Sequence, residues 1–238
     1  MTIQRLYLGE RLHEGKLVEL DRGRSHYLLH VLRLKPGRNI QLFNQRDGEW
    51  LSVVRNSGRH SVTVEIFSQT CPAVEEPGSI LVMTPIRPSR FEWVIEKAVE
   101  LGVRAIQPIL SSRTVVKLEK LDRISSIAIE AAEQCGRMSV PEIHETLPLG
   151  AWLAGRDTSC ELWFADERRT GRSLLELRQS RSSGRPDLLI GPEGGFTEDE
   201  RTAIMEAPNV VPVSLGPRIL RAETAAIAAL AILGVSTD

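Results

Sequence analysis

The feature that most constrains this chain is the regular alternation of short apolar runs and helical patterns after residue 78. Five apolar runs of strand length are each followed by a segment with helical spacing. Parallel strands need a crossover connection, and a helix commonly supplies it, so this alternation predicts a parallel sheet with helices on both faces. The predicted strands are residues 80–83, 105–109, 161–165, 187–190 and 210–213. The C-terminal part of the chain is therefore expected to be α/β.

Helix start and stop signals support this interpretation. Ser89, Ser173 and Thr197 each stand three residues before a glutamate, which is the pattern of a capping box. Gly102 and Gly136 follow periodic segments and are expected to end helices. The predicted helices start at 89, 118, 173, 197 and 222, and the last of them is rich in alanine.

The first 70 residues have a different pattern. Short apolar or alternating runs are separated by turn signals, which is typical of a small β-barrel. The predicted strands are residues 6–8, 17–20, 40–43, 50–54 and 62–67, and one helix is expected over 26–34. Residues 71–78, with two prolines and two glutamates, are interpreted as a linker. We therefore expect two domains, residues 1–72 and 73–238.

Charge and composition narrow the possible functions. Hydrophobic residues make up 42% and charged residues 26%, which excludes a disordered chain. Residues 1–72 hold 11 Lys and Arg against 7 Asp and Glu, a net charge of +4, and the remainder has −5. A basic module of this kind is suited to a polyanion, although +4 is also compatible with ordinary solvated surface.

Location and metal binding can also be judged from the sequence. No apolar run reaches the length of a membrane span, and charge precedes any stretch of signal-peptide length, so we expect a cytoplasmic protein. The three cysteines form no C-x-x-C pair. His26 and His30 have helical spacing for a metal pair, but no carboxylate or thiol lies nearby in the sequence. No metal site is expected.

Two glycine-containing loops, residues 191–196 and 215–221, follow predicted strands and precede predicted helices. Ligands of open α/β sheets bind beyond the carboxyl ends of the strands, so these loops are candidates for a binding site. The first loop lacks the Lys-Ser/Thr of a phosphate-binding loop, and Glu193 would repel phosphate. A neutral or cationic ligand suits it better. The alternative is two tight turns that merely cap helices.

The second loop carries Arg218 and Arg221, and Glu223 follows in the first turn of the alanine-rich helix. Glu223 is explained equally well as a partner of the helix dipole. Arg221 is not, because the dipole at a helix N-terminus favours negative charge. An arginine here points to an anionic ligand or substrate.

The two loops together resemble those of the SPOUT methyltransferases, and within them the ribosomal RNA small subunit methyltransferase E family. Similar stretches extend along nearly the whole chain, at residues 5–7, 26–37, 92–102 and 130–137. The resemblance implies a PUA-like N-terminal β-barrel, a C-terminal domain with a trefoil knot, and a homodimer. It also implies methylation of N3 of a uridine in 16S rRNA, within the 30S subunit, with S-adenosylmethionine as methyl donor.

The resemblance also implies site residues. The donor would be held by Leu189, Ile190, Gly191, Pro192, Glu193, Gly194, Gly195, Leu215, Gly216, Ile219, Leu220 and Arg221. Uracil N3 carries a proton that must leave before the nitrogen can attack. We expect Arg221, or Arg218, to stabilise negative charge on the uracil oxygens. Glu223 is the candidate general base, and water is the alternative.

Basic residues in both domains are candidates for binding RNA. They are Arg5, Arg24, His26, His30, Arg33, Lys35 and Arg38 in the barrel, and Arg87, Arg90, Arg113 and Arg137 on the α/β body. The sequence departs from the family pattern in two places. Residues 87–90 read Arg-Pro-Ser-Arg where Lys-Gly-Asp-Arg is usual, and Ala222 replaces threonine.

Three alternative functions remain at this point. One is a non-catalytic RNA-binding assembly factor, which the presence of Arg221 and Glu223 disfavours. Another is a related methyltransferase acting on a different rRNA or tRNA nucleotide. The third is a phosphate-using nucleotide enzyme, which Glu193 disfavours.

Overall fold

The computed structural model describes residues 3–57, 61–116, 118, 121–168, 171–180 and 184–234. The chain forms two compact units. The first contains Met1–Glu76 together with Ala132–Val140, and the second contains Pro77–Ala131 and Pro141–Asp238. The boundary between Glu76 and Pro77 lies in the predicted linker. The assignment of residues 132–140 to the first unit was not anticipated from the sequence.

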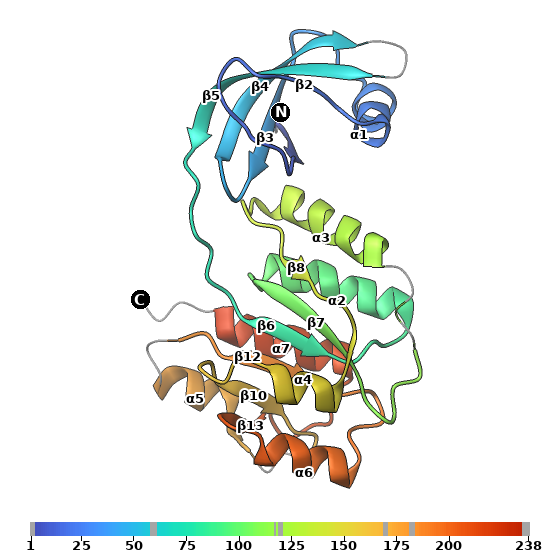
Figure 1. The fold of residues 1–238 in the computed structure, drawn as a ribbon, viewed down its shortest axis with the longest axis vertical. Coiled ribbons are helices and arrows are strands. Elements are labelled where there is room, and N and C mark those ends of the chain that lie inside the picture. Colours follow the sequence, from blue (N-terminus) through green and yellow to red (C-terminus); the bar gives the residue numbers. More distant parts are fainter. Residues whose placement is uncertain are drawn as a thin grey trace. The chain divides into compact units, whose positions relative to one another are not determined.

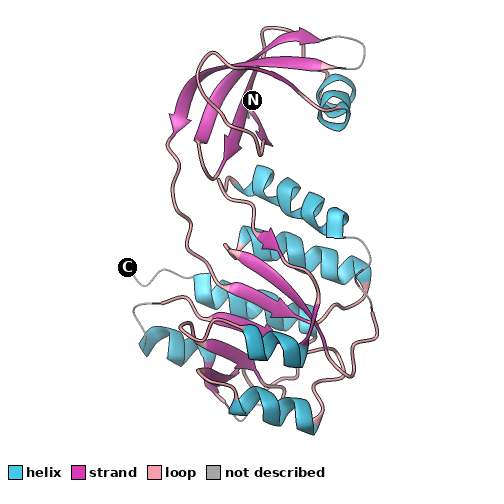
Figure 2. Ribbon diagram, viewed as in Figure 1, coloured by secondary structure: helices cyan, strands magenta, loops and turns pink. Residues whose placement is uncertain are grey.

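The second unit is built on a parallel sheet (Figures 1 and 2). All five predicted strands are confirmed, and three short ones join them. In chain order they are β6 (Ile80–Met83), β7 (Ala105–Leu110), β8 (Glu142–Ile143), β9 (Leu147–Pro148), β10 (Leu162–Ala165), β11 (Arg172–Ser173), β12 (Asp187–Ile190) and β13 (Val210–Ser214). The order across the sheet is β11-β13-β10-β12-β6-β7-β8, and β9 pairs with β7. Every one of these pairings is parallel.

Helices lie on both faces of this sheet, as the alternating pattern predicts. The helices that follow β6 in the chain are α2 (Pro88–Glu100), α3 (Leu121–Cys135), α4 (Leu149–Gly155), α5 (Leu174–Ser180), α6 (Glu198–Glu206) and α7 (Ala222–Gly234), and the last residues of α3 belong to the first unit. Helices α2 and α5 both pack against α7, and α4 packs against α6 (Figure 1). In the part of the chain that the structure describes, no helix combines the length and apolarity needed to cross a membrane.

The central strands are almost completely buried, which explains their continuous apolar sequences. Trp163 and Phe164 of β10, and Leu188 and Leu189 of β12, are at most 1% exposed. Burial of these side chains is the main force that holds the helical layers onto the sheet. Elements β8, β9, β11 and α4 were missed from the sequence because two to seven residues are too few to show a period.

The capping predictions had mixed outcomes. The box at Thr197 is confirmed, since its hydroxyl accepts from the Glu200 amide and the Glu200 carboxylate accepts from the Thr197 amide at 2.9 Å. Burial raises the pKa of Glu200, but hydrogen bonds from the Thr197 and Ser112 amides outweigh it and leave that pKa lowered. The box at Ser89 is wrong. Helix α2 begins at Pro88, which needs no amide partner in the first turn and already has helical φ.

The first unit contains a curved five-stranded sheet (Figure 1). All five predicted strands are confirmed, as β1 (Gln4–Tyr7), β2 (Leu17–Glu19), β3 (Asn39–Asn44), β4 (Gly48–Ser57) and β5 (Val62–Cys71). Their order is β1-β3-β4-β5-β2; β1 and β3 are parallel, and the other pairs are antiparallel. A core that includes Leu28, Ile40 and Ile66 fills the concave face.

The helix predicted over 26–34 is displaced and irregular. Helix α1 (Arg22–His26) is capped by Asp21, whose side chain accepts from the Arg24 amide at 2.8 Å. A π-helical turn, η1 (Tyr27–Val31), follows directly, and Arg33 then has a φ of +52°. Both features are uncommon for ordinary residues and carry a conformational cost.

Arg5 is a structural residue, in contrast to its predicted role in binding RNA. Its guanidinium donates to the carbonyls of Ala132 and Arg137 at 3.1 and 2.9 Å, and so satisfies acceptors at the C-terminal end of α3. It also pairs with Glu49 at 2.7 Å and lies 4.1 Å from the ring centre of Phe43. The Arg5 side chain is 12% exposed, so little of it can reach a phosphate.

Arg137 is also buried, and it belongs to the first unit rather than to the α/β body. Its exposed fraction is 9%, and its guanidinium binds Glu76 at 3.0 Å and Ser139 at 2.7 Å. Burial raises the pKa of Glu76, but hydrogen bonds from Ser139, the Met138 amide and Arg137 leave it lowered. Because both side chains are engaged within the first unit, Arg5 and Arg137 are not candidates for contacting RNA.

Replacing Arg5 by alanine should destabilise the first unit by about 2–4 kcal/mol, because Glu49 and the helix-end carbonyls lose their partner. Urea unfolding measures this change. The matched control is Arg11→Ala, which removes an exposed arginine of the same unit. Equal stability of the two variants would contradict the structural role. RNA affinity of folded Arg5→Ala should match that of the wild type.

Candidate functional site

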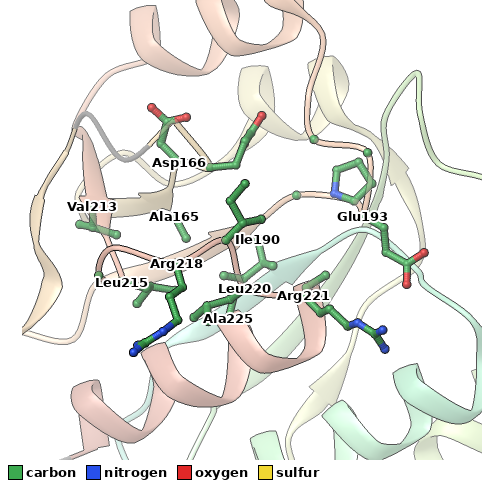
Figure 3. Close-up of a pocket in the computed structure, with 18 of the residues that line it drawn as sticks. Ala165, Asp166, Ile190, Glu193, Val213, Leu215, Arg218, Leu220, Arg221 and Ala225 are labelled. Atoms are coloured by element: carbon green, nitrogen blue, oxygen red, sulfur yellow. The ribbon is translucent and has the colours of Figure 1, made fainter.

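A pocket in the second unit has a volume of about 720 Å³, within the range of small-molecule sites (Figure 3). It lies at the carboxyl ends of β10, β12 and β13. The predicted donor-binding residues line it from Ile190 to Gly195, at Leu215 and Gly216, and from Ile219 to Arg221. Leu189 does not, because its side chain is fully buried within β12.

The register of three strands brings the two loops together. β10 lies between β12 and β13, and its last residue, Ala165, is aligned with Ile190 on one side and Val213 on the other. The three strands therefore end near the same level of the sheet. All three of these residues line the pocket (Figure 3). The two loops are not on adjacent strands, and the end of β10 lies between them.

The first loop is fixed by packing. Phe196 is 4% exposed and stacks edge-on against Phe164, with ring centres 5.7 Å apart. Its ring covers Gly191 so closely that a Cβ there would lie 2.8 Å from it. The side chain of residue 196 thus anchors the loop, and glycine at 191 permits the close approach.

Hydrogen bonds within the loop and from Arg113 also fix its conformation. The Gly195 amide donates to the Pro192 carbonyl at 2.9 Å, in a turn where Gly195 has a φ of +69°. The Arg113 guanidinium donates to the Gly194 carbonyl at 2.6 Å. Arg113, a predicted RNA contact, therefore holds the loop in this structure.

The end of β10 contributes two acidic residues that sequence reasoning missed. Asp166 is buried and accepts from Arg201 at 2.7 Å and from the Arg168 amide at 3.2 Å. The hydrogen bond to Asp166 raises the pKa of Arg201 above its ordinary value. This ion pair joins α6 to the end of β10. Glu167, next in the chain, also lines the pocket. The sequence contained a signal for both residues, because acidic side chains directly after a predicted strand are candidates for a site at the strand's carboxyl end.

The second loop is more exposed. Ile219 is 80% exposed, and Arg218 and Arg221 on either side of it are also exposed. In Figure 3, Arg218 and Arg221 point in different directions, and Arg221 extends toward the same side of the pocket as Glu193. The narrow face of α7, with Ala222 and Ala225, completes this wall.

Arg90 links the first loop to helix α7. It pairs with Glu193 at 2.8 Å and with Glu223 at 3.3 Å, and it lines the pocket together with Arg87. The charge of Glu193, which the sequence suggested as an attraction for a cationic ligand, is therefore offset by Arg90.

Glu223 lies beneath the rim rather than in the pocket. It is 7% exposed and absent from the lining residues. Its Oε2 atom has no hydrogen-bond partner among the described residues. The predicted general base is thus placed beside Arg90, not beside the space that a substrate would enter.

The basic residues predicted in the first unit gather on one segment. His26, His30, Arg33, Lys35 and Arg38 are exposed, and the rings of the two histidines lie 4.7 Å apart. Arg24 is partly occupied, since it pairs with Asp21 and donates to the Tyr7 carbonyl at 2.9 Å. Within the described residues, no group of three or more His, Cys, Asp and Glu could hold a metal ion.

Comparison with known proteins agrees with this organisation. The RNA methyltransferase domain model matches residues 74–234, and the RNA methyltransferase PUA domain model matches residues 20–67. Two solved structures align over nearly the whole of both chains. One is a methyltransferase from Legionella pneumophila with the cofactor SAM bound, at a TM-score of 0.87, 30% identity, and coverage of 98% of this chain and 97% of the other.

The second is a ribosomal RNA small subunit methyltransferase E from Neisseria gonorrhoeae bound to S-adenosyl methionine. Its TM-score is 0.85 at 34% identity, with 97% of this chain and 96% of the other covered. A sequence relative with the same name, from Rickettsia conorii, is 31% identical over 97% of this chain and 95% of its own length. This chain belongs to the ribosomal RNA small subunit methyltransferase E family of RNA methyltransferases.

Proposed function

We propose that this protein transfers the methyl group of S-adenosylmethionine to N3 of a uridine in 16S rRNA. One observation carries the proposal: two glycine-containing loops meet around a pocket at the aligned ends of β10, β12 and β13. That pocket belongs to a chain whose family members methylate small-subunit ribosomal RNA, and relatives have been solved with this donor bound.

The pocket suits this donor in size and lining. Its volume of about 720 Å³ can hold the donor and part of a nucleotide. Ile190, Leu215, Leu220 and Ala225 provide apolar surface for a purine, and the loop backbones provide amides and carbonyls for its edges. When bound, S-adenosylmethionine supplies an electrophilic methyl group on a sulfonium.

The protein's main task is to position the nucleophile and to stabilise its developing charge. Loss of the N3 proton leaves negative charge on the two uracil carbonyl oxygens. Arg221 lies at the pocket rim with an exposed guanidinium, and we assign it the stabilisation of that charge. Arg218, on the other side of Ile219, is the second candidate. The uridine must leave its stack to reach this position.

Water rather than Glu223 is the proton acceptor that we propose. Glu223 is buried and is not among the residues that line the pocket, which favours water over its carboxylate as the acceptor. Its pairing with Arg90 gives it a positioning role, because Arg90 also holds Glu193 of the donor loop.

The RNA would be held by the exposed basic segment of the first unit and by the basic residues beside the pocket. The first group comprises the exposed His26, His30, Arg33, Lys35 and Arg38, together with the half-buried Arg24. The second comprises Arg87, Arg90 and Arg113, which also shape the pocket. A 30S substrate, a cytoplasmic location, a trefoil knot and a homodimer belong to the same proposal.

The proposal is tested by incubating the protein with labelled S-adenosylmethionine and 30S subunits that lack native methylation. We expect label in 3-methyluridine of 16S rRNA, identified by nucleoside analysis. Label in a different nucleoside would replace the substrate and keep the donor. Donor binding without any transfer, to subunits or to naked 16S rRNA, would favour the assembly-factor alternative.

Replacing Arg221 by alanine should lower turnover by about 100- to 1,000-fold, because the charge on the uracil oxygens loses its partner. Donor affinity, measured by calorimetry, should change far less. Arg123→Ala, which removes an exposed arginine of the same unit outside the pocket lining, is the matched control. Equal losses in turnover and in donor binding would contradict the assignment.

RNA binding should weaken steeply with salt, because phosphate contacts release counterions. Arg33→Ala and Lys35→Ala should each make the slope of log affinity against log salt shallower by about 0.7–0.9. Arg55→Ala provides the control, since Arg55 is exposed in the same unit but pairs with Glu65. A slope that is unchanged in the first two variants would place the RNA elsewhere.

A further inference from the structure

Glu167 differs from the other acidic residues of the pocket because its carboxylate has no ion-pair partner in the part of the chain that the structure describes. Asp166 is bound by Arg201, and Glu193 is bound by Arg90. Among the described residues, Glu167 forms neither a hydrogen bond nor an ion pair, although it interacts electrostatically with Arg201. A carboxylate that lines a pocket with its acceptors unused is available to a ligand.

The backbone of the first loop (residues 191–196) lies close to this carboxylate. A Cβ at position 195 would lie 2.5 Å from Oε1 of Glu167 and 3.0 Å from its Cδ. Gly195 also has a φ of +69°, which other residues rarely adopt. The backbone at Gly195 therefore lies directly beside the carboxylate of Glu167, whose side chain is otherwise exposed.

We propose that Glu167 accepts hydrogen bonds from the 2′- and 3′-hydroxyls of the ribose of the methyl donor. This inference rests on the proposed function, because it concerns the donor's nucleoside. A carboxylate has acceptors for both hydroxyls of a vicinal diol. Acidic residues beyond the ends of strands bind ribose hydroxyls in the same way in dinucleotide-binding folds.

The donor also carries an ammonium group, which is the competing ligand for a carboxylate. The place of Glu167 in the chain favours the diol, because it follows the end of β10 and lines the pocket, as do the acidic residues that bind ribose hydroxyls in dinucleotide-binding sheets. A probe that has the diol but no ammonium group distinguishes the two ligands.

Isothermal calorimetry with three probes tests the assignment. S-adenosylhomocysteine carries both the diol and the ammonium, 5′-methylthioadenosine carries only the diol, and its 2′,3′-dideoxy analogue carries neither. Glu167→Ala should weaken binding of the first two by about 10- to 100-fold, and Glu167→Gln should weaken it less. The dideoxy analogue should bind the wild type and both variants equally.

Glu206→Gln is the matched control, because Glu206 is exposed at the end of α6 and outside the pocket lining. It should bind all three probes as the wild type does. A loss confined to S-adenosylhomocysteine would assign Glu167 to the ammonium and overturn the inference. Unchanged affinity for 5′-methylthioadenosine in both Glu167 variants would overturn it as well. Failure of the wild type to bind S-adenosylhomocysteine would instead refute the proposed function, and the inference with it.

Discussion

The register of β10 between β12 and β13 is the constraint on which the site depends. Hydrogen bonds of the parallel ladders align Ala165, Ile190 and Val213, so three separate chain segments leave the sheet at the same level. Strands β10 and β12 are almost completely buried, and a slip by one residue would turn their side chains into the opposite layers. The position of the loops, and hence the pocket, follows from packing within the sheet.

The loops themselves are held by a small number of directional contacts. Phe196 anchors the first loop to the core, and Arg113 binds the carbonyl of Gly194. Arg201 and Arg90 neutralise acids on either side of the pocket. These contacts order the site before a ligand enters, and this preorganisation lowers the entropic cost of binding. They also involve Arg90 and Arg113, two of the arginines that the sequence suggested as RNA contacts.

Sequence reasoning succeeded where a local pattern has one dominant physical cause. The buried strands are continuous apolar runs, and the box at Thr197 caps α6 by hydrogen bonds within one turn. It failed where a competing local or tertiary effect decided the outcome. Proline at 88 displaced the predicted start of α2, and a π-helical turn replaced the regular helix expected over 26–34.

Arginine side chains show the limit most clearly. Arg5 and Arg33 are both basic residues of the first unit, yet Arg5 is buried against Phe43, Glu49 and the end of α3, while Arg33 is exposed. The sequence alone determined the two kinds of domain, the strand positions and the two glycine-containing loops, because periodicity and turn chemistry act over a few neighbouring residues. Only the tertiary structure decided which charges are paired, that Glu223 lies outside the pocket, and that Glu167 lies against Gly195. Those contacts join residues far apart in the chain, and no local pattern encodes such a distance.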